Sequence, residues 1–213
     1  MADENKPLKI GKMVVGEMQT NSFFVYREGE SKVIFFDPAS QGKYICDKLK
    51  ENGFEVEVIL LTHGHFDHIG GVDALREASG AKVYAMEAEK VLLEDAYVNV
   101  SAQMHRPVTV TADGFFNDGD ILEYGDKKCR VIGTPGHTIG SCCFYFEEAG
   151  ILIGGDTLFA ESYGRTDFPT GKLSSLRESV EKKLFVLPDD TKVYPGHGPA
   201  TTIGHEKEFN PLF

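Results

Sequence analysis

The segment that decides the fold is VEVILL (residues 56–61), followed directly by THGHFDHIGG (residues 62–71). The first six residues predict a buried strand, because their far end is continuously apolar. The next ten place His63, His65, Asp67 and His68 in a loop at the carboxyl end of that strand, where α/β proteins usually carry their chemistry. Histidine and carboxylate side chains bind zinc and similar ions, so four such residues within six positions predict a metal site.

Three further segments repeat this arrangement of a polar side chain directly after a predicted strand. They are GTPGHT (133–138), GGDT (154–157) and PGHG (195–198), after predicted strands at 129–132, 151–153 and 191–194. Each places one candidate ligand in a turn, namely His137, Asp156 or His197. Glycine lets the backbone approach a metal closely, and proline stiffens the turn. Each turn alone is typical of a hydrogen-bonded residue, but three repeats favour a metal site.

The order of the predicted elements favours one layered α/β domain with mixed sheets, spanning residues 1–213. Further strands are predicted at 8–18, 21–26, 32–36, 121–124 and 141–146, and helices at 42–52 and 173–185. No low-complexity tract, close repeat or linker rich in Pro, Gly or Ser divides the chain. We expect the two remaining histidines, His105 and His205, to be surface residues or to form local hydrogen bonds.

The composition excludes several classes of protein. The chain has 213 residues, 41% of them hydrophobic, which is enough for one sizeable core. Its net charge of −11 and the lack of a Lys/Arg run argue against nucleic-acid binding, because binding to the phosphate backbone depends on clustered cations. No apolar stretch reaches the roughly 18 residues that span a membrane. The polar start Met1–Lys9 lacks a signal-peptide pattern, and four cysteines without a CxxC fit a reducing compartment, so we expect a cytoplasmic protein.

The motifs THGHFDH, TPGHT, GGDTLF and YPGHG together resemble those of the metallo-β-lactamase superfamily, over nearly the whole chain. The resemblance implies a four-layer αββα sandwich, in which two mixed β-sheets pack together with helices outside and the site lies at one edge. It also implies two divalent metal ions. The implied ligands are His63, His65 and His137 for one ion, Asp67, His68 and His197 for the other, and Asp156 as a bridge between them. Zinc is the expected metal, although iron and manganese tolerate the same ligands.

Two such ions would suit hydrolysis. Ions about 3.5–4 Å apart can share a hydroxide that forms at neutral pH without a protein base. They also polarise the attacked carbonyl. Asp67 is the candidate catalytic residue, because its carboxylate could orient the hydroxide. A thioester suits this site, because a thiol with a pKa of about 8.5 leaves as the thiolate and needs no strong general acid to protonate it.

Within the superfamily, two segments are similar to the short glyoxalase II-like, or hydroxyacylglutathione hydrolase-like, group. These segments are GDTLFAESYGRTDFPTG (155–171) and TTIGHEKEFNP (201–211). The resemblance implies a thioesterase that hydrolyses a small molecule, S-lactoylglutathione or a similar acyl thioester. The two-domain glyoxalase II has Lys and Tyr where this chain has Arg165 and Asp167. Arg165 therefore either binds a substrate carboxylate or closes a turn with Asp167.

Other functions remain open at this point. A persulfide dioxygenase, also with a GRTDF-like run, would use one iron held by His63, His137 and Asp156. A metal-binding scaffold without turnover would need the same ligands as the hydrolase. β-Lactamases of the familiar dinuclear type carry cysteine at the position of Asp156 and are usually exported, which weighs against an antibiotic-degrading role. The thiol carrier and the oligomeric state are not indicated by the sequence.

Overall fold

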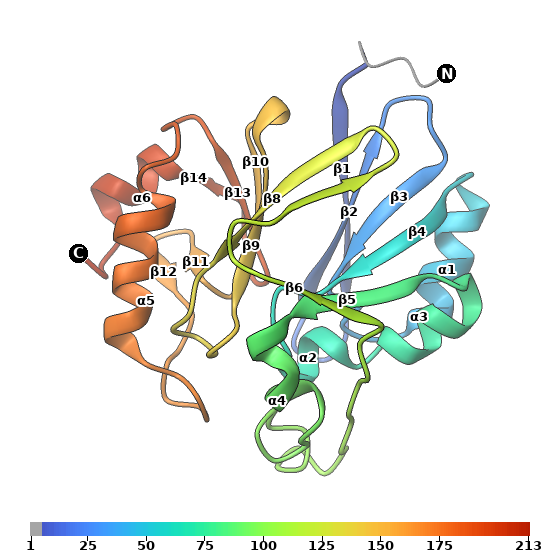
Figure 1. Cartoon of the computed structure of the whole chain (residues 1–213), viewed down its shortest axis with the longest axis horizontal. Coiled ribbons are helices and arrows are strands. Elements are labelled where there is room, and N and C mark those ends of the chain that lie inside the picture. The colour runs from blue at the N-terminus through green and yellow to red at the C-terminus, as the bar shows by residue number, and fades with distance from the viewer. Residues whose placement is uncertain (1–5) are drawn as a thin grey trace.

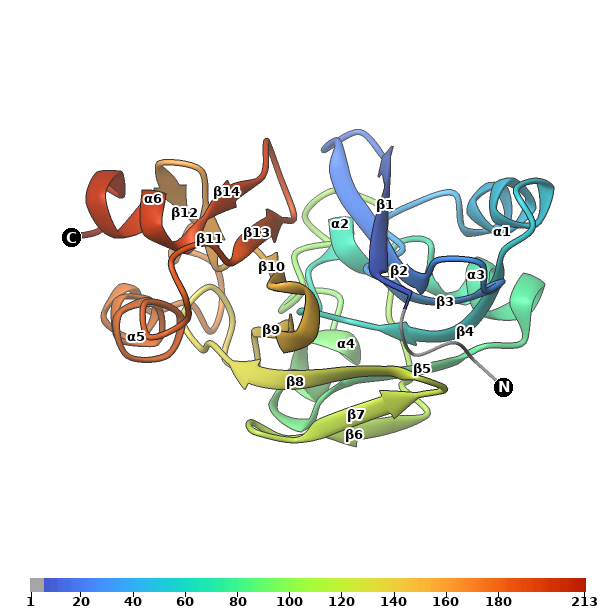
Figure 2. The same ribbon diagram turned by 90° about the horizontal axis from the view of Figure 1, so that it is seen from above.

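The computed structural model describes residues 6–213, and the first five residues of the polar amino-terminal segment lie outside that range. Two six-stranded sheets pack face to face, with helices on both outer sides (Figures 1 and 2). This arrangement confirms the predicted α/β sandwich with two mixed sheets. Within the described residues, no helix is both long enough and apolar enough to cross a membrane.

The first sheet combines an antiparallel hairpin region with parallel crossovers. Its strands, in spatial order, are β1 (Leu8–Val15), β2 (Thr20–Arg27), β3 (Lys32–Phe36), β4 (Glu55–Leu60), β5 (Lys82–Met86) and β6 (Gly114–Phe116). Strands β1 to β3 pair antiparallel, and β3 to β6 pair parallel. Helices α1 (Gly42–Glu51) and α3 (Val72–Ser79) cover its outer face. Short helices α2 (Phe66–Ile69) and α4 (Lys90–Leu93) and the 3₁₀ turn Glu87–Glu89 lie between its strands along the chain.

The second sheet is also mixed. Its order is β14 (Thr201–Thr202), β13 (Lys192–Pro195), β10 (Ile151–Gly155), β9 (Cys142–Phe146), β8 (Lys127–Gly133) and β7 (Ile121–Tyr124). Only β10 and β13 pair parallel in it, through a crossover that contains α5 (Leu173–Ser179) and a π-helical turn (Val180–Leu184). Helix α6 (Ile203–Phe209) joins α5 on its outer face. The small hairpin β11 (Leu158–Phe159) and β12 (Ser162–Tyr163) and the 3₁₀ turn Glu147–Ala149 complete the chain.

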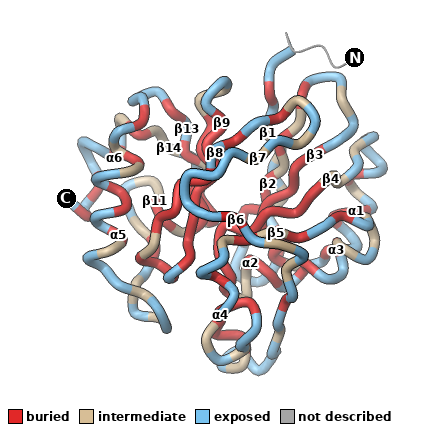
Figure 3. The backbone as a smooth tube through the Cα atoms, in the orientation of Figure 1, coloured by how far each residue is buried: buried red, intermediate tan, exposed pale blue. Residues whose placement is uncertain are grey.

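Alternation along the strands produces the layers, because successive side chains in a strand face opposite sides of a sheet. In β3, Phe35 packs in the cluster under α1 and α3, whereas Phe36 packs between the sheets, 5.1 Å from the ring centroid of Phe144. In β9, Cys142 faces the other sheet and Cys143 faces α5 and α6, as adjacent residues of a strand do. Figure 3 accordingly shows buried strands between largely exposed outer helices.

Candidate metal centre

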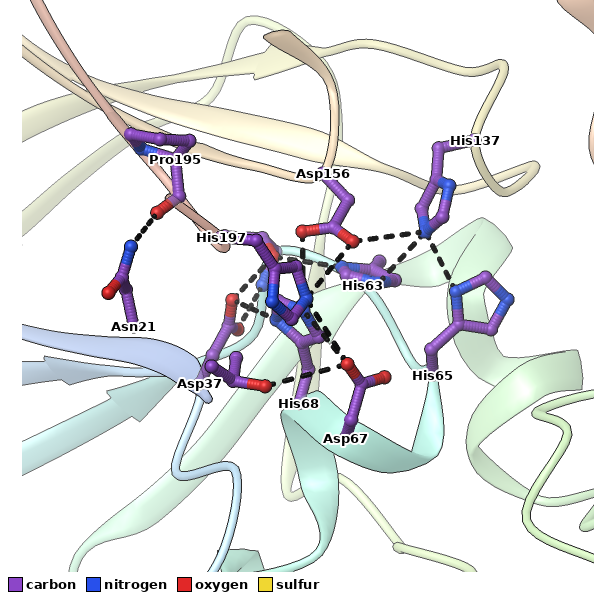
Figure 4. Close-up of polar contacts among 12 residues, drawn as sticks. Asn21, Asp37, His63, His65, Asp67, His68, His137, Asp156, Pro195 and His197 are labelled. Carbon is purple, nitrogen blue, oxygen red and sulfur yellow. Dashed lines mark hydrogen bonds and ion pairs between the residues drawn. The ribbon is translucent and has the colours of Figure 1, made fainter. Parts of the chain in front are cut away.

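All seven predicted ligands lie together at one edge of the sandwich (Figure 4). They are His63, His65, Asp67, His68, His137, Asp156 and His197. The loops after β4, β8, β10 and β13 supply five of them, because the carboxyl ends of these strands meet at this edge. Asp67 and His68 do not lie in a loop, as the sequence suggested, but in the single turn of α2. This helical turn gives the two neighbouring side chains different directions from those of a strand.

Three imidazole nitrogens converge in the first group of ligands. His137 Nε2 lies 2.8 Å from His65 Nδ1 and 3.2 Å from His63 Nε2. All three rings are buried, with exposed fractions of 3% or less. We call this group the three-histidine group.

Hydrogen bonds on the far sides of the rings determine which nitrogens carry protons. His137 Nδ1 lies 2.7 Å from the carbonyl oxygen of Arg165, so it donates its proton there. His63 Nδ1 lies 3.1 Å from the Thr62 hydroxyl, which itself donates to Asp37 at 2.6 Å and therefore accepts from the ring. A neutral imidazole has only one proton, so the Nε2 atoms of His63 and His137 face each other as lone pairs. A cation between them would remove this repulsion, so the donor set fits a metal ion.

The second group consists of Asp67, His68 and His197, and we call it the aspartate-histidine group. His197 Nε2 lies 3.2 Å from Asp67 Oδ2, and His68 Nε2 lies 3.9 Å from the same oxygen. Asp156 lies between the two groups. Its Oδ1 is 3.3 Å from His68 Nε2, and its Oδ2 is 3.7 Å from His137 Nε2 and 3.5 Å from His197 Nε2. Its carboxylate is therefore placed to bridge two ions.

Apart from His65 Nε2, which is not the ring nitrogen that faces His137, two buried atoms of this centre make no hydrogen bond in the structure, namely His68 Nε2 and Asp156 Oδ1. Buried polar atoms without partners are rare, because burial removes the water that would otherwise satisfy them. Both atoms point into the space between the ligand groups. A divalent ion would satisfy both, which is a second reason why these residues fit a metal pair.

The pKa shifts place most of the ligands in the protonation state that binds a cation. Burial, together with the neighbouring imidazoles, lowers the pKa of His63 well below its usual value and that of His65 to about 3, so these rings are neutral. Burial alone would raise the pKa of Asp156, but the charge of His68 outweighs it and holds that pKa low. Burial lowers the pKa of His68, yet Asp156 and Asp37 raise it well above the usual value. A metal ion would therefore have to displace a proton from His68.

Two buried carboxylates that the sequence analysis missed support the ligands from outside. Asp37, directly after β3, accepts a hydrogen bond from His68 Nδ1 at 2.9 Å. Glu89 accepts from the amide of Gly64 at 3.1 Å and from the Thr138 hydroxyl at 3.0 Å, so it connects the loops that carry His63, His65 and His137. Such partners orient metal ligands. The position of Asp37 at a strand end was a usable signal, whereas nothing local distinguishes Glu89.

Arg165 lies in the loop beside the three-histidine group, and its side chain bonds within that loop. Its Nε and Nη2 donate to the two carboxylate oxygens of Asp167 at 2.7 and 2.6 Å. Its guanidinium also lies 3.9 Å from the ring centroid of Phe168, which packs against His65. The structure thus contains the turn contact that was one of the two alternatives for Arg165. His205 is a surface residue, as one of the two expectations had it, and its Nε2 lies 3.1 Å from Oε1 of Glu161.

The chain belongs to the metallo-β-lactamase superfamily, whose family model matches residues 15–197. It is 38% identical to the probable metallo-hydrolase YqgX of Bacillus subtilis (strain 168), over 96% of this chain and 97% of that protein. It is 34% identical to the hydroxyacylglutathione hydrolase GloC of Haemophilus influenzae, over 93% of this chain and 94% of that protein. Family and geometry together define a metallo-hydrolase superfamily member whose His/Asp cluster suits divalent metal ions.

Solved structures show the same fold. The crystal structure of the B3 metallo-β-lactamase BLEG-1 matches with a TM-score of 0.91 and 37% identity, and the match covers 96% of this chain and 99% of that chain. The structure of TTHA1623 in a di-iron-bound form matches with a TM-score of 0.84 and 31% identity, covering 95% of this chain and 100% of that chain. The second of these proteins therefore binds a pair of metal ions on a closely similar fold.

Proposed function

We propose that the protein is a dinuclear metal-dependent hydrolase that cleaves acyl thioesters such as S-lactoylglutathione, with zinc as its metal. The observation that carries this proposal is the pair of ligand groups joined by Asp156. When bound, two divalent ions supply a hydroxide nucleophile at neutral pH and polarise the attacked carbonyl. The 34% identity to GloC, a hydroxyacylglutathione hydrolase, supports a thioester as the substrate.

The most exposed ligands indicate where the substrate would approach. The side chains of Asp67 and His197 are 14% and 27% exposed, whereas that of His68 is fully buried. Burial raises the pKa of Asp67, but its hydrogen bond with His197 and the charge of His68 lower it below the usual value. Asp67 is therefore an ionised acceptor at the open side of the centre, where it can orient the attacking nucleophile. The thiolate then leaves without needing a protonated side chain.

Two other activities use parts of the same centre. A persulfide dioxygenase with one iron would need His63, His137 and Asp156, and would leave the aspartate-histidine group without a role. Hydrolysis of β-lactams is the second candidate function, because the B3 metallo-β-lactamase BLEG-1 is 37% identical to this chain. Both candidates make different products from a thioesterase, so one set of assays separates them.

The test combines metal analysis with three assays on the purified protein. We expect about two ions per chain, release of free thiol from S-lactoylglutathione, and much slower hydrolysis of the β-lactam nitrocefin. One iron per chain, together with oxygen consumption on addition of glutathione persulfide, would contradict the proposal. Faster turnover of nitrocefin than of any thioester would support the second candidate. Two bound ions without turnover of any substrate would leave only the metal-binding scaffold.

A further inference from the structure

A cavity of about 760 Å³ opens beside Asp67, on the exposed side of the metal centre. Four segments of the sequence form its wall: the turn between β1 and β2, residues 39–41, helix α2 with Gly70, and residues 104–108. Ligand pockets in proteins usually have volumes of roughly 300–1,000 Å³. The hydroxyacyl group of the proposed substrate is far smaller than this cavity. The cavity therefore has room for the thiol carrier.

The cavity contains one basic side chain, that of Arg106, and two acidic ones, those of Glu17 and Asp67. Arg106 Nη1 lies 2.9 Å from Glu17 Oε1, and both side chains are 77% exposed. Such exposed ion pairs contribute little to stability, because both groups stay hydrated and screened. Arg106 can therefore exchange Glu17 for another carboxylate at small cost, and its planar guanidinium can bind that carboxylate through two parallel hydrogen bonds.

Two methionines lie in the same wall. Met18 is 50% exposed and Met104 is 45% exposed, although both side chains are large and apolar. Methionine is flexible and polarisable, so it adapts its shape to ligands. The cavity thus offers one available cation beside an adaptable apolar surface. This combination suits a molecule with both a carboxylate and a stretch of methylene groups.

We propose that this cavity binds the thiol carrier of the substrate and that Arg106 binds a carboxylate of that carrier. The inference rests on the proposed thioesterase function. A hydroxyacyl group such as lactoyl has no carboxylate, so the negative charge of the substrate lies on the thiol side. The thioester itself lies at the Asp67 end of the cavity. Arg106 therefore determines the preference of the enzyme for acidic thiols over neutral ones.

Arg165, the basic residue that the sequence singled out, is less suited to this role. Two of its nitrogens already donate to Asp167, and its guanidinium packs on Phe168. A substrate carboxylate would have to replace both bonds to Asp167. Arg106 has one exposed partner to exchange, and it lines the cavity, whereas Arg165 does not.

The test compares two substrates, S-lactoylglutathione and S-lactoyl-N-acetylcysteamine, whose carrier is uncharged. We expect Arg106→Ala to lower the ratio of their kcat/KM values about tenfold, through a higher KM for the glutathione ester, because a charge-assisted hydrogen bond is lost. Glu17→Gln should raise the ratio about threefold, because it frees Arg106. Arg177→Ala, an exposed change on α5, is the matched control and should leave the ratio unchanged. An unchanged ratio in Arg106→Ala, or a loss in Arg165→Ala instead, would overturn the inference.

A binding measurement keeps the inference testable without hydrolysis. S-methylglutathione is a thioether that the enzyme cannot hydrolyse, and calorimetry gives its Kd for each variant. We expect about tenfold weaker binding to Arg106→Ala than to the wild type, and weaker binding to both at high salt. If no thioester is hydrolysed, the proposed function fails but this comparison still decides the role of the cavity. Equal affinity of the wild type and Arg106→Ala, or no binding by either, would exclude the carboxylate site.

Discussion

The carboxylate of Asp156 lies within 3.7 Å of ligand nitrogens from both ligand groups. Its replacement by alanine removes the bridge and leaves the other six ligands in place. We expect Asp156→Ala to bind one ion or fewer per chain and to lose turnover on the order of 10³-fold, because paired ions stabilise the charge that develops in the reaction. Metal analysis and thiol release measure the two effects. The exposed change Asp190→Ala is the control, and near-wild-type activity of Asp156→Ala would exclude a nucleophile shared by two ions.

Asp37 is not one of the seven predicted ligands, but it contacts one of them, His68. Its Oδ2 accepts hydrogen bonds from His68 Nδ1 at 2.9 Å and from the Thr62 hydroxyl at 2.6 Å. Asparagine tolerates the left-handed backbone of this position, where φ is 47°, but it offers only one acceptor oxygen. We therefore expect Asp37→Asn to fold normally and to bind the ion of the aspartate-histidine group roughly 10- to 100-fold more weakly. Chelator competition measures this affinity, and equal affinity in the two proteins would show that Asp37 does not orient His68.

Among the elements, the 3₁₀ turn Glu87–Glu89 connects the loops after β4 and β8 through one fully buried carboxylate. Burial raises the pKa of Glu89 to about 7, from 4.5 as its ordinary value, although Thr138 and the amides of Gly64 and Gly140 act in the opposite direction. Between these two pH values the unfolded chain releases a proton that the folded protein retains. The free energy of unfolding therefore falls as the pH rises through this window and stays constant above it.

Replacement of Glu89 by glutamine tests this contribution, because glutamine cannot ionise. In protein stripped of metal, raising the pH from about 5 to about 8 should lower the free energy of unfolding of both proteins. We expect the decrease to be on the order of 2–3 kcal/mol larger in the wild type than in Glu89→Gln. Urea unfolding at the two pH values measures this difference. If the two proteins change in parallel with pH, the Glu89 carboxyl does not carry the effect.

Several elements that the sequence predicted have a clear period. The helix expected at 42–52 is α1 (Gly42–Glu51), and the strand expected at 32–36 is β3 (Lys32–Phe36). The missed elements include α3, with eight residues, and α6, with seven, as well as the very short α2, with four, and β14, with two. Such short elements have no periodicity of their own, because contacts made elsewhere in the fold determine them. The helix expected at 173–185 is α5 as far as Ser179 and continues as the π-helical turn Val180–Leu184.

Some residues of the candidate site were predictable from the sequence, and others were not. The seven ligands were predictable because their residue types cluster in the sequence or recur after strands. The roles of Glu89 and Arg106 were not, because a single acid or base in the sequence looks like any charged surface residue. Their partners, Thr138 and Glu17, lie 49 and 89 positions away along the chain. Only the folded structure brings these pairs together.

At the scale of the whole molecule, both sheets contribute to the metal centre. The loop and helix after β4 supply four ligands from the first sheet, and the loops after β8, β10 and β13 supply three from the second. At the opposite end of the sandwich, ion pairs of the buried Arg27 and Lys127 also join the sheets. Arg27 of β2 pairs there with Asp126 and Glu148, and Lys127 of β8 pairs with Glu57. The ion pairs thus connect the two sheets at one end of the sandwich, and metal ions would connect them at the other end.

Metal removal should therefore destabilise the whole fold rather than the site alone. Ions that bind only the folded state add about 4 kcal/mol when their free concentration is a thousandfold above Kd. In a domain of this size each kcal/mol shifts Tm by roughly 2–4 °C. We expect chelation to lower the Tm of the wild type by on the order of 10 °C, measured by calorimetry, and added zinc to restore it. The same treatment should shift Asp156→Ala much less, because that variant has lost the bridge between ligands from the two sheets. Equal Tm values for loaded and stripped wild type would show that the sheets are held together without the metal centre.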